Sequence, residues 1–176
     1  MWGDFNLFFT TGLPSYVLYP SLGITFALVL IGIFTKSIKA KASFILWILL
    51  IEYFFVLISS TVIFRTHITN ARWELMPFWT YLAVFDHIQG VSVWDIILNV
   101  ALFIPFGLLT KLLFPRIGLI KVFLLCMICS LCIETLQNVF NKGISQLDDT
   151  MHNTIGGTIG WMLARCITKY TSIIKR

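Results

Sequence analysis

The chain has 176 residues, of which 58% are hydrophobic and only 12% are charged, and its net charge is +5. A water-soluble domain of this size needs more polar surface, so the composition excludes one and indicates a membrane protein. Basic loops beside anionic lipid account for the positive charge. The sequence holds no Lys/Arg-rich run, zinc-ligand spacing or glycine-rich phosphate loop. We therefore expect one transmembrane domain over residues 1–176, without a nucleic-acid partner, a metal or a cofactor.

Five hydrophobic stretches are each long enough to cross a bilayer. An apolar helix rises ~1.5 Å per residue and needs about 20 residues to cross a hydrocarbon core of ~30 Å. The fifth stretch is the weakest, because its continuous apolar run begins only after Asn153. We expect the first to be retained, since its first positive charge, Lys36, follows the apolar run instead of preceding it. The predicted spans are residues 13–34, 43–64, 94–114, 118–140 and 149–167.

The distribution of Lys and Arg predicts the orientation, because basic loops tend to stay in the cytoplasm. Ten basic residues fall on one side: Lys36, Lys39, Lys41, Lys111, Arg116, Lys121, Arg165, Lys169, Lys175 and Arg176. Three fall on the other: Arg65, Arg72 and Lys142. We expect an all-α protein of the bacterial plasma membrane, a compact bundle of five transmembrane helices with the N-terminus outside and the C-terminus inside.

The segment 65–93 is predicted to lie outside, between the second and third spans, and it is too long for a bare connector. Its Trp73, Phe78 and Trp79 stand beside charges, a composition that suits the membrane interface. We expect an interfacial lid. Arg72 is the predicted ligand for an anionic group such as a lipid phosphate, because a guanidinium binds such groups through two parallel hydrogen bonds. The alternative for Arg72, and more so for Arg65, is ordinary headgroup contact.

Polar side chains inside the spans are the candidate functional residues, because each is costly in hydrocarbon unless it is paired. In the third span, Asp95 and Asn99 stand one helical turn apart, and Pro105 and Gly107 are expected to interrupt the helix further along.

The fourth span carries a polar stripe of Ser130, Glu134, Gln137 and Asn141 on one helical face. It runs toward the predicted outer end of the span. We expect it to face the neighbouring helices.

The fifth span begins with Asp148 and Asp149 and adds Asn153 one turn later. Either aspartate is a candidate helix N-cap. Below them, the Gly156-xxx-Gly160 pattern predicts a close approach to another helix. By helical rise, Asn99, Gln137 and Asn153 lie within about one helical turn of one level, with Glu134 slightly deeper. Three helices are therefore expected to build one polar layer around a pocket open to the outside.

Two interpretations of these groups remain open. They fix helix register through hydrogen bonds with one another, or they form a functional site. Glu52, near the middle of the second span, poses the same choice. It is a neutral acid bonded to a neighbouring helix, or part of a proton or ion pathway.

Four motifs in order resemble those of the VanZ-like membrane family. They are the run from Asn99 to Gly107 (NVALFIPFG), Glu134-x-x-Gln137, Asp149-x-x-x-Asn153-Thr154-x-Gly156-Gly157, and the earlier segment from Arg72 to Phe78. The likeness covers roughly residues 65–165. Two positions depart from the family pattern: Gln146 stands where the leading acid of an Asp-x-x-Asp pair is usual, and Glu74 where an Asn is usual.

The resemblance implies a multi-pass plasma-membrane protein associated with resistance to teicoplanin-type glycopeptides. Our first hypothesis is a binding protein that engages a lipid-tailed antibiotic or an envelope lipid through Arg72, Asn99, Gln137, Asp148 and Asn153. The second is a membrane enzyme that acts on a lipid-linked wall precursor with Glu134 and Asp149 as an acid/base pair. A transporter is the third, although the chain lacks the internal repeat that many transporters have.

Overall fold

The computed structural model describes residues 14–34, 38–88 and 92–174, and most of them are helical. The helices are α2 (Ser15–Ile33), α3 (Ile38–Ile58), α4 (Trp79–Phe85), α5 (Val93–Leu113), α6 (Leu119–Val139) and α7 (Leu147–Ile174). A π-helical turn, η1 (Ser59–Ile63), continues α3. The expected helical architecture is confirmed, with one addition: two short strands, β1 (Trp73–Glu74) and β2 (Ser145–Gln146), pair in parallel.

Each predicted span coincides with a helix. In lipid, the backbone N–H and C=O groups of a long apolar run can all form hydrogen bonds only within a helix or a closed barrel. Among the described residues, four helical stretches are long and apolar enough to cross a membrane: Ser15–Ile33, Ala40–Ile63, Val93–Leu113 and Leu119–Val139. Helix α7 is longer than any of these but is not among them. Some positions used in the sequence predictions lie outside the described residues. They are the start of the first predicted span and the basic residues Lys36, Lys175 and Arg176.

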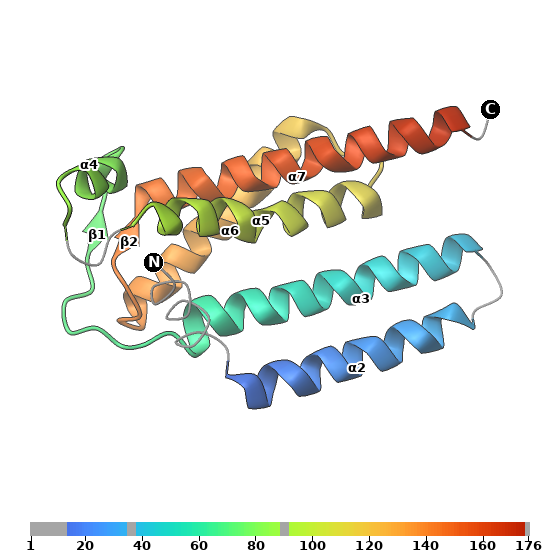
Figure 1. Ribbon diagram of the computed structural model, residues 1–176, viewed down its shortest axis with the longest axis horizontal. Coiled ribbons are helices and arrows are strands. Elements are labelled where there is room, and N and C mark those ends of the chain that lie inside the picture. The colour runs from blue at the N-terminus through green and yellow to red at the C-terminus, as the bar shows by residue number, and fades with distance from the viewer. Residues whose placement is uncertain (1–13, 35–37, 89–91, 175–176) are drawn as a thin grey trace.

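The helices form two groups (Figure 1). Helices α5, α6 and α7 pack together, and α2 and α3 form an antiparallel hairpin beside them. The strands and α4 gather at one end of the bundle, near the start of α5 and α7. The apolar core takes side chains from both groups, among them Leu57 of α3 and Phe103, Val122, Ile133 and Trp161 of α5, α6 and α7.

Glycines bring α5 and α7 into direct backbone contact. A Cβ added at Gly156 would lie 2.0 Å from the carbonyl oxygen of Val100, and one at Gly160 would lie 2.0 Å from that of Ile104. The close approach predicted from the Gly156-xxx-Gly160 pattern is therefore confirmed. On α5, Gly107 also allows the close approach, because a Cβ added there would overlap the backbone of Gly157 on α7.

The predicted interruption of the third span was wrong. Helix α5 runs unbroken from Val93 to Leu113 with Pro105 inside it. A proline removes only one backbone donor, and neighbouring helices can support the helix around it in a membrane bundle. Tyr53 of α3 contacts this region, donating from its hydroxyl to the carbonyl oxygen of Leu102 at 3.1 Å.

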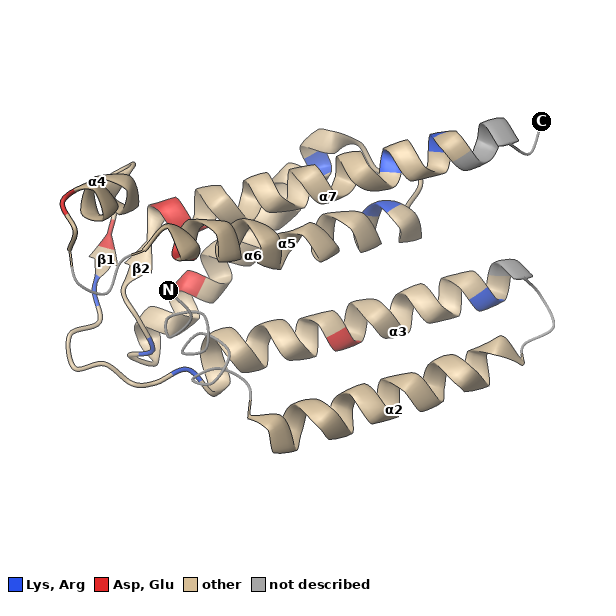
Figure 2. Ribbon diagram, in the orientation of Figure 1, with Lys and Arg blue, Asp and Glu red and all other residues tan. Residues whose placement is uncertain are grey.

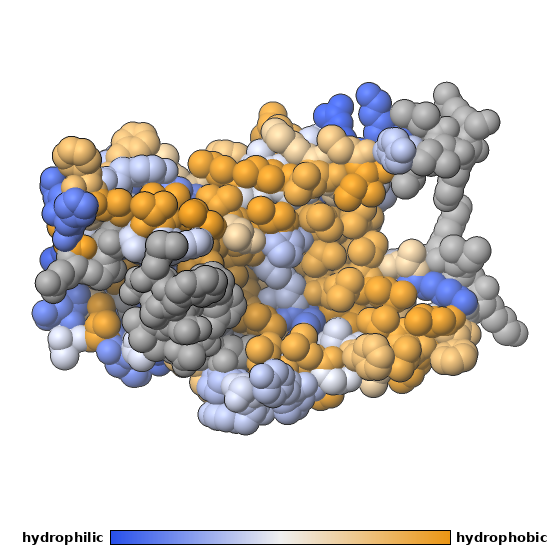
Figure 3. Space-filling view, viewed as in Figure 1, coloured by the Kyte–Doolittle hydropathy of each residue, from blue (hydrophilic) through white to orange (hydrophobic). Residues whose placement is uncertain are grey.

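Charged residues gather at the two ends of the bundle, and the acidic residues lie mostly at the end that carries α4 (Figure 2). Arg72 directly precedes β1 at that end, and Lys142 donates from Nζ to the carbonyl oxygens of Ile63 and Arg65. Lys111 lies in the last turn of α5 and Arg165 in the second half of α7. Apolar side chains cover much of the helices in between (Figure 3). This distribution matches the separation of basic residues from which the orientation was predicted.

Among the acidic residues that the structure describes, Glu52 lies away from both ends, and it fastens α2 to α3. One carboxylate oxygen accepts a hydrogen bond from the hydroxyl of Ser21 at 2.8 Å, and the other accepts one from Thr25 at 3.0 Å. Of the two interpretations of Glu52, this geometry favours an acid bonded to a neighbouring helix.

Candidate functional site

Five polar residues that the sequence singled out lie at the α4 end of the bundle, where α5, α6 and α7 meet. We call Asn99, Glu134, Gln137, Asp149 and Asn153 the polar layer. Glu134, Gln137 and Asn153 are almost completely buried. Asn99 and Asp149 are partly buried. The five residues belong to the three helices α5, α6 and α7.

Hydrogen bonds join the helices through this layer. Asn99 of α5 donates from Nδ2 to Oδ1 of Asp149 on α7 at 2.6 Å. Asn153, one turn further along α7, donates from Nδ2 to the hydroxyl of Ser130 on α6 at 2.8 Å. Asn99 and Asn153 therefore lie about one helical turn apart in depth, which is within the range that helical rise predicted.

Glu134 and Gln137 connect α6 to the segments on either side. Glu134 accepts a hydrogen bond at Oε2 from the backbone N–H of Gln146 at 3.0 Å. Gln137 donates from Nε2 to the carbonyl oxygen of Thr61, within η1, at 3.1 Å. Because π-helical turns are frequent at functional sites, the contact of Gln137 with this turn is consistent with more than a structural role.

Some polar atoms of the layer have no hydrogen-bond partner within the described chain. They are Oε1 of Gln137 and Oδ1 of Asn153, and both are buried. Nδ1 of His152, which is outside the layer, is buried and unpaired as well. Leaving a buried polar atom unpaired costs about 1–3 kcal/mol, so native proteins rarely do so without a reason. The layer thus presents two amide oxygens that are able to accept hydrogen bonds from a ligand.

The charges of the layer are two acids and one neighbouring cation. Glu134 and Asp149 interact electrostatically with each other, and Arg65 acts on both with its positive charge. The guanidinium of Arg65 lies against Gly143, since a Cβ added there would be 3.1 Å from its Cζ. Headgroup contact was the favoured interpretation of Arg65, although its position directly after an apolar span lets a long side chain reach back over the bundle.

Arg72, the basic residue predicted to bind an anionic group, is not part of the layer. It is exposed, and the contact that fixes its backbone is a hydrogen bond from the Ser145 N–H to its carbonyl oxygen at 3.0 Å. Arg65 is the arginine that the fold brings near the acids.

Asp148 has a different partner from the one expected. It does not cap α7, which already begins at Leu147. Its carboxylate accepts hydrogen bonds from the backbone N–H groups of Phe78 at 2.7 Å and Thr80 at 2.8 Å, at the start of α4. Asp148 therefore caps α4, and this fully buried side chain fastens the segment that contains α4 to α7.

Two further contacts hold the same segment. The hydroxyl of Thr80 donates to Oε1 of Gln146 at 2.9 Å, and the hydroxyl of Tyr81 lies 2.9 Å from Nε2 of His152. His152 is a residue that the sequence reasoning missed, because a single histidine on a helix gives no signal of its partner. We call residues 73–88, which contain β1 and α4, the lid.

The lid covers the end of the bundle beside the layer. Phe78 and His87, on either side of α4, adopt left-handed backbone conformations with φ of 63° and 51°. The expected pocket open to the outside is not what the described residues form, since Glu134, Gln137 and Asn153 are no more than 3% exposed. In this structure the layer is closed.

The two positions that depart from the family pattern are direct partners. Glu74 of β1 is in register with Gln146 of β2. The usual amide and acid are thus exchanged between the two strands, and the strand pair keeps one of each. Both residues stand where the lid joins α7.

Asp95 has a local role at the start of α5. Its side chain accepts a hydrogen bond from the backbone N–H of Ser92 at 2.7 Å, as an acid does in the first turn of a helix. Asp95 therefore does not extend the polar layer through hydrogen bonding, although it was expected on the same face as Asn99.

Comparison with known proteins agrees with the motifs. A stretch of the chain is 39% identical over 69 residues to Protein VanZ of Enterococcus faecium, a match that covers 39% of this chain and 43% of that protein. No solved structure matches. The family model described as VanZ/LLP1 matches residues 44–168, which include the whole polar layer and the lid. The chain is therefore a member of the VanZ/LLP1 family.

Proposed function

We propose that this chain is a multi-pass plasma-membrane protein that contributes to resistance to teicoplanin-type glycopeptides, or to envelope homeostasis, by engaging a lipid-tailed antibiotic or an envelope lipid at the polar layer. The observation that carries the proposal is the pair of buried, unpartnered amide oxygens of Gln137 and Asn153. They stand beside two acids and a cation at the end of a bundle of membrane-spanning helices.

The orientation that we propose places this site at the outer surface. Helix α7 lies along α5 and serves as the fifth crossing, with its polar first turns at the outer boundary. Its 28 residues rise about 42 Å, more than the hydrocarbon core requires. The basic residues at the far end then lie in the cytoplasm, and the lid and the layer face outward, where lipid-linked wall precursors are found.

The lid suits the membrane interface in this arrangement. Its exposed side chains include Trp73, Leu75, Phe78, Tyr81 and Phe85. Aromatic rings of this kind settle at headgroup depth, beside the polar boundary. A ligand with a lipid tail approaches along the same boundary and meets the lid before it reaches the layer.

Ligand entry requires the lid to move, because the layer is closed. Opening breaks the two hydrogen bonds to Asp148 and the Tyr81–His152 contact. Phe78 and His87 are the positions that change, since left-handed backbone costs energy for residues other than glycine and relaxes on release. Substrate-gated loops in enzymes and binding proteins use hinges of this sort.

The chemistry of the layer defines the ligand that it favours. The amide oxygens of Gln137 and Asn153 accept hydrogen bonds from hydroxyl or amide groups. Arg65 attracts an anionic group, and the acids of the layer favour donors and disfavour a ligand with exposed negative charge near them. A polar headgroup rich in hydroxyl or amide donors, with a single anionic group on the Arg65 side, meets these requirements.

The proposal is tested by equilibrium binding to purified protein in nanodiscs. The probes are teicoplanin, vancomycin and a panel of purified envelope lipids. We expect stoichiometric binding of a lipid-tailed ligand, weakened at least severalfold in Asn153→Ala and unchanged in Asp86→Asn, an exposed acid of the lid end. Absence of binding across the whole panel contradicts the proposal.

The alternative is an integral-membrane enzyme that acts on a lipid-linked cell-wall precursor, with Glu134 and Asp149 as an acid/base pair. The observation that favours it is the electrostatic interaction between buried Glu134 and partly buried Asp149. Two coupled acids in different surroundings can hold their protons differently, as acid/base chemistry requires. Glu134→Gln separates the two proposals: loss of the phenotype with unchanged ligand binding favours the enzyme, and equal loss of binding favours a binding protein.

A further inference from the structure

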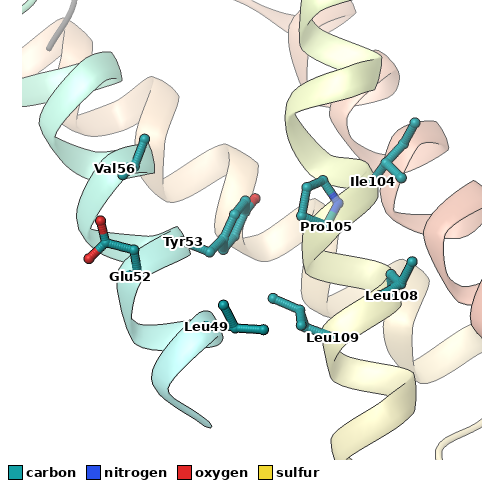
Figure 4. A pocket seen from close by; sticks show the side chains of 8 residues that line it. All are labelled: Leu49, Glu52, Tyr53, Val56, Ile104, Pro105, Leu108 and Leu109. Carbon is teal, nitrogen blue, oxygen red and sulfur yellow. The ribbon is translucent and has the colours of Figure 1, made fainter. Parts of the chain in front are cut away.

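A groove opens between α3 and α5 in the interior of their membrane-spanning stretches (Figure 4). Its volume is about 440 Å³, within the range of about 300–1,000 Å³ that is usual for small-molecule sites. Side chains of both helices line it: Leu49, Glu52, Tyr53, Val56, Ile104, Pro105, Leu108 and Leu109.

The lining offers hydrocarbon and no free polar group. Both oxygens of Glu52 accept hydrogen bonds from α2, and Figure 4 shows this carboxylate directed away from α5. The hydroxyl of Tyr53 is bonded to the carbonyl oxygen of Leu102. Pro105 has no N–H to offer. An occupant therefore gains contact with aliphatic and aromatic surface and meets no unpaired donor or acceptor.

The groove points toward the polar layer on both helices. Its upper lining is Val56 on α3 and Ile104 on α5. Thr61, whose carbonyl oxygen accepts from Gln137, lies five residues beyond Val56, and Asn99 lies five residues before Ile104. At ~1.5 Å per residue, both sides place the layer roughly 7 Å above the groove, toward the lid.

We propose that the groove holds one acyl chain of the envelope lipid whose headgroup the polar layer engages, an inference that rests on the proposed function. Three observations carry it: the lining is apolar, the groove lies in the interior of two candidate membrane spans, and the polar layer lies roughly 7 Å further along both helices. A lipid at this place keeps its headgroup at the outer boundary and its chain beside α3 and α5.

A transmembrane helix is a poorer occupant. The lining spans only residues 49–56 of α3 and 104–109 of α5, about 10 Å and 8 Å along the two helices. A helix with its side chains is about 10–12 Å wide and packs along several turns. A short slot of this size matches the narrow cross-section of a single hydrocarbon chain.

The test uses a fatty acid with a diazirine at its end, fed to the bacterium that expresses the full chain and grown without glycopeptide. The probe then enters every acyl lipid of the membrane. After irradiation, mass spectrometry locates the adducts on the protein, and the adduct mass reports the lipid. We expect groove residues to be labelled severalfold more than Ile120 and Ile128, exposed apolar residues of α6.

Leu49→Trp fills the groove, because Leu49 lines it and is partly exposed. The matched control is Ile51→Trp, an exposed position of the same helix that does not line the groove. We expect Leu49→Trp to reduce groove labelling severalfold and Ile51→Trp to leave it unchanged. Groove labelling no higher than that of α6, or a crosslink to a second copy through the groove, overturns the inference.

Asn153→Ala tests whether occupancy of the groove depends on the polar layer, because Asn153 belongs to the layer and does not line the groove. We expect groove labelling to fall severalfold in this variant, because the headgroup has lost its anchor. Undiminished labelling means that bulk lipid fills the groove, and it overturns the proposal that the chain belongs to the lipid bound at the polar layer. The proposed function fails separately, through absent binding of the nanodisc panel. Strong binding there with no groove labelling overturns the acyl-chain inference alone.

Discussion

Asn99 and Asp149 join α5 to α7 by a hydrogen bond of 2.6 Å directly above the place where Gly156 brings the two helix backbones together. Because the bond and the backbone contact are adjacent, the position of Asp149 depends on the packing of the two helices. The polar layer is therefore held by its own hydrogen bonds and by the glycines beneath it.

Replacing Asn99 tests the first of these supports. Asn99→Ala removes a hydrogen bond to an acidic group, and we expect a loss of about 1.5–3 kcal/mol in unfolding free energy. Asn99→Asp places a second acid against Asp149 and destabilises further, by like-charge repulsion. Chemical denaturation in mild detergent measures both, with the exposed Ile97→Ala as the control. Equal stability of all four proteins contradicts this role for Asn99.

Gly160→Ala tests the backbone contact. Its new Cβ would lie 2.0 Å from the Ile104 carbonyl oxygen, so α5 and α7 must separate. We expect a loss of about 1–3 kcal/mol, the usual cost of overpacking. The control is Gly23→Ala in α2, where an added Cβ meets nothing within 4 Å and should stabilise the helix by up to about 1 kcal/mol. Thermal unfolding in detergent separates the two, and a stable Gly160→Ala protein argues against the contact.

Asp148→Ala should release the lid. It removes both acceptors from the start of α4, and we expect faster amide hydrogen exchange over residues 78–85. Asp148→Asn keeps one acceptor oxygen and should give an intermediate rate. Asp86→Ala, at the exposed end of α4, is the matched control. Exchange rates of residues 78–85 that stay at the wild-type level in Asp148→Ala show that other contacts hold the lid.

Glu52 variants separate helix fastening from proton transfer. Glu52→Gln retains an acceptor and gains donors, and the hydroxyls of Ser21 and Thr25 can rotate to meet it. Glu52→Leu retains neither. We expect wild-type stability for Glu52→Gln and a loss of about 1 kcal/mol per hydrogen bond for Glu52→Leu. If both variants lose drug protection equally while Glu52→Gln stays stable, the interpretation of Glu52 as part of a proton pathway is favoured instead.

The helices were predictable because apolar runs and the small-residue pattern at Gly156 and Gly160 act locally. The members of the polar layer were predictable for the same reason, since helical spacing places Glu134 and Gln137 on one face. Their partners were not. The hydrogen bonds of Asp148 to α4 depend on the path of a loop, and so does the position of Arg65 near the acids. Sequence periodicity does not predict the path of a loop. A strand pair of two residues each leaves no pattern at all.

The most direct test of the account is growth inhibition by teicoplanin and vancomycin in a susceptible bacterium that expresses the wild type, Glu134→Ala, Asp149→Ala or the Asp86→Ala control at matched membrane levels. We expect the wild type and the control to protect the bacterium, and both polar-layer variants to lose that protection. Protection undiminished in Glu134→Ala and Asp149→Ala, or no protection by the wild type from either drug, contradicts it.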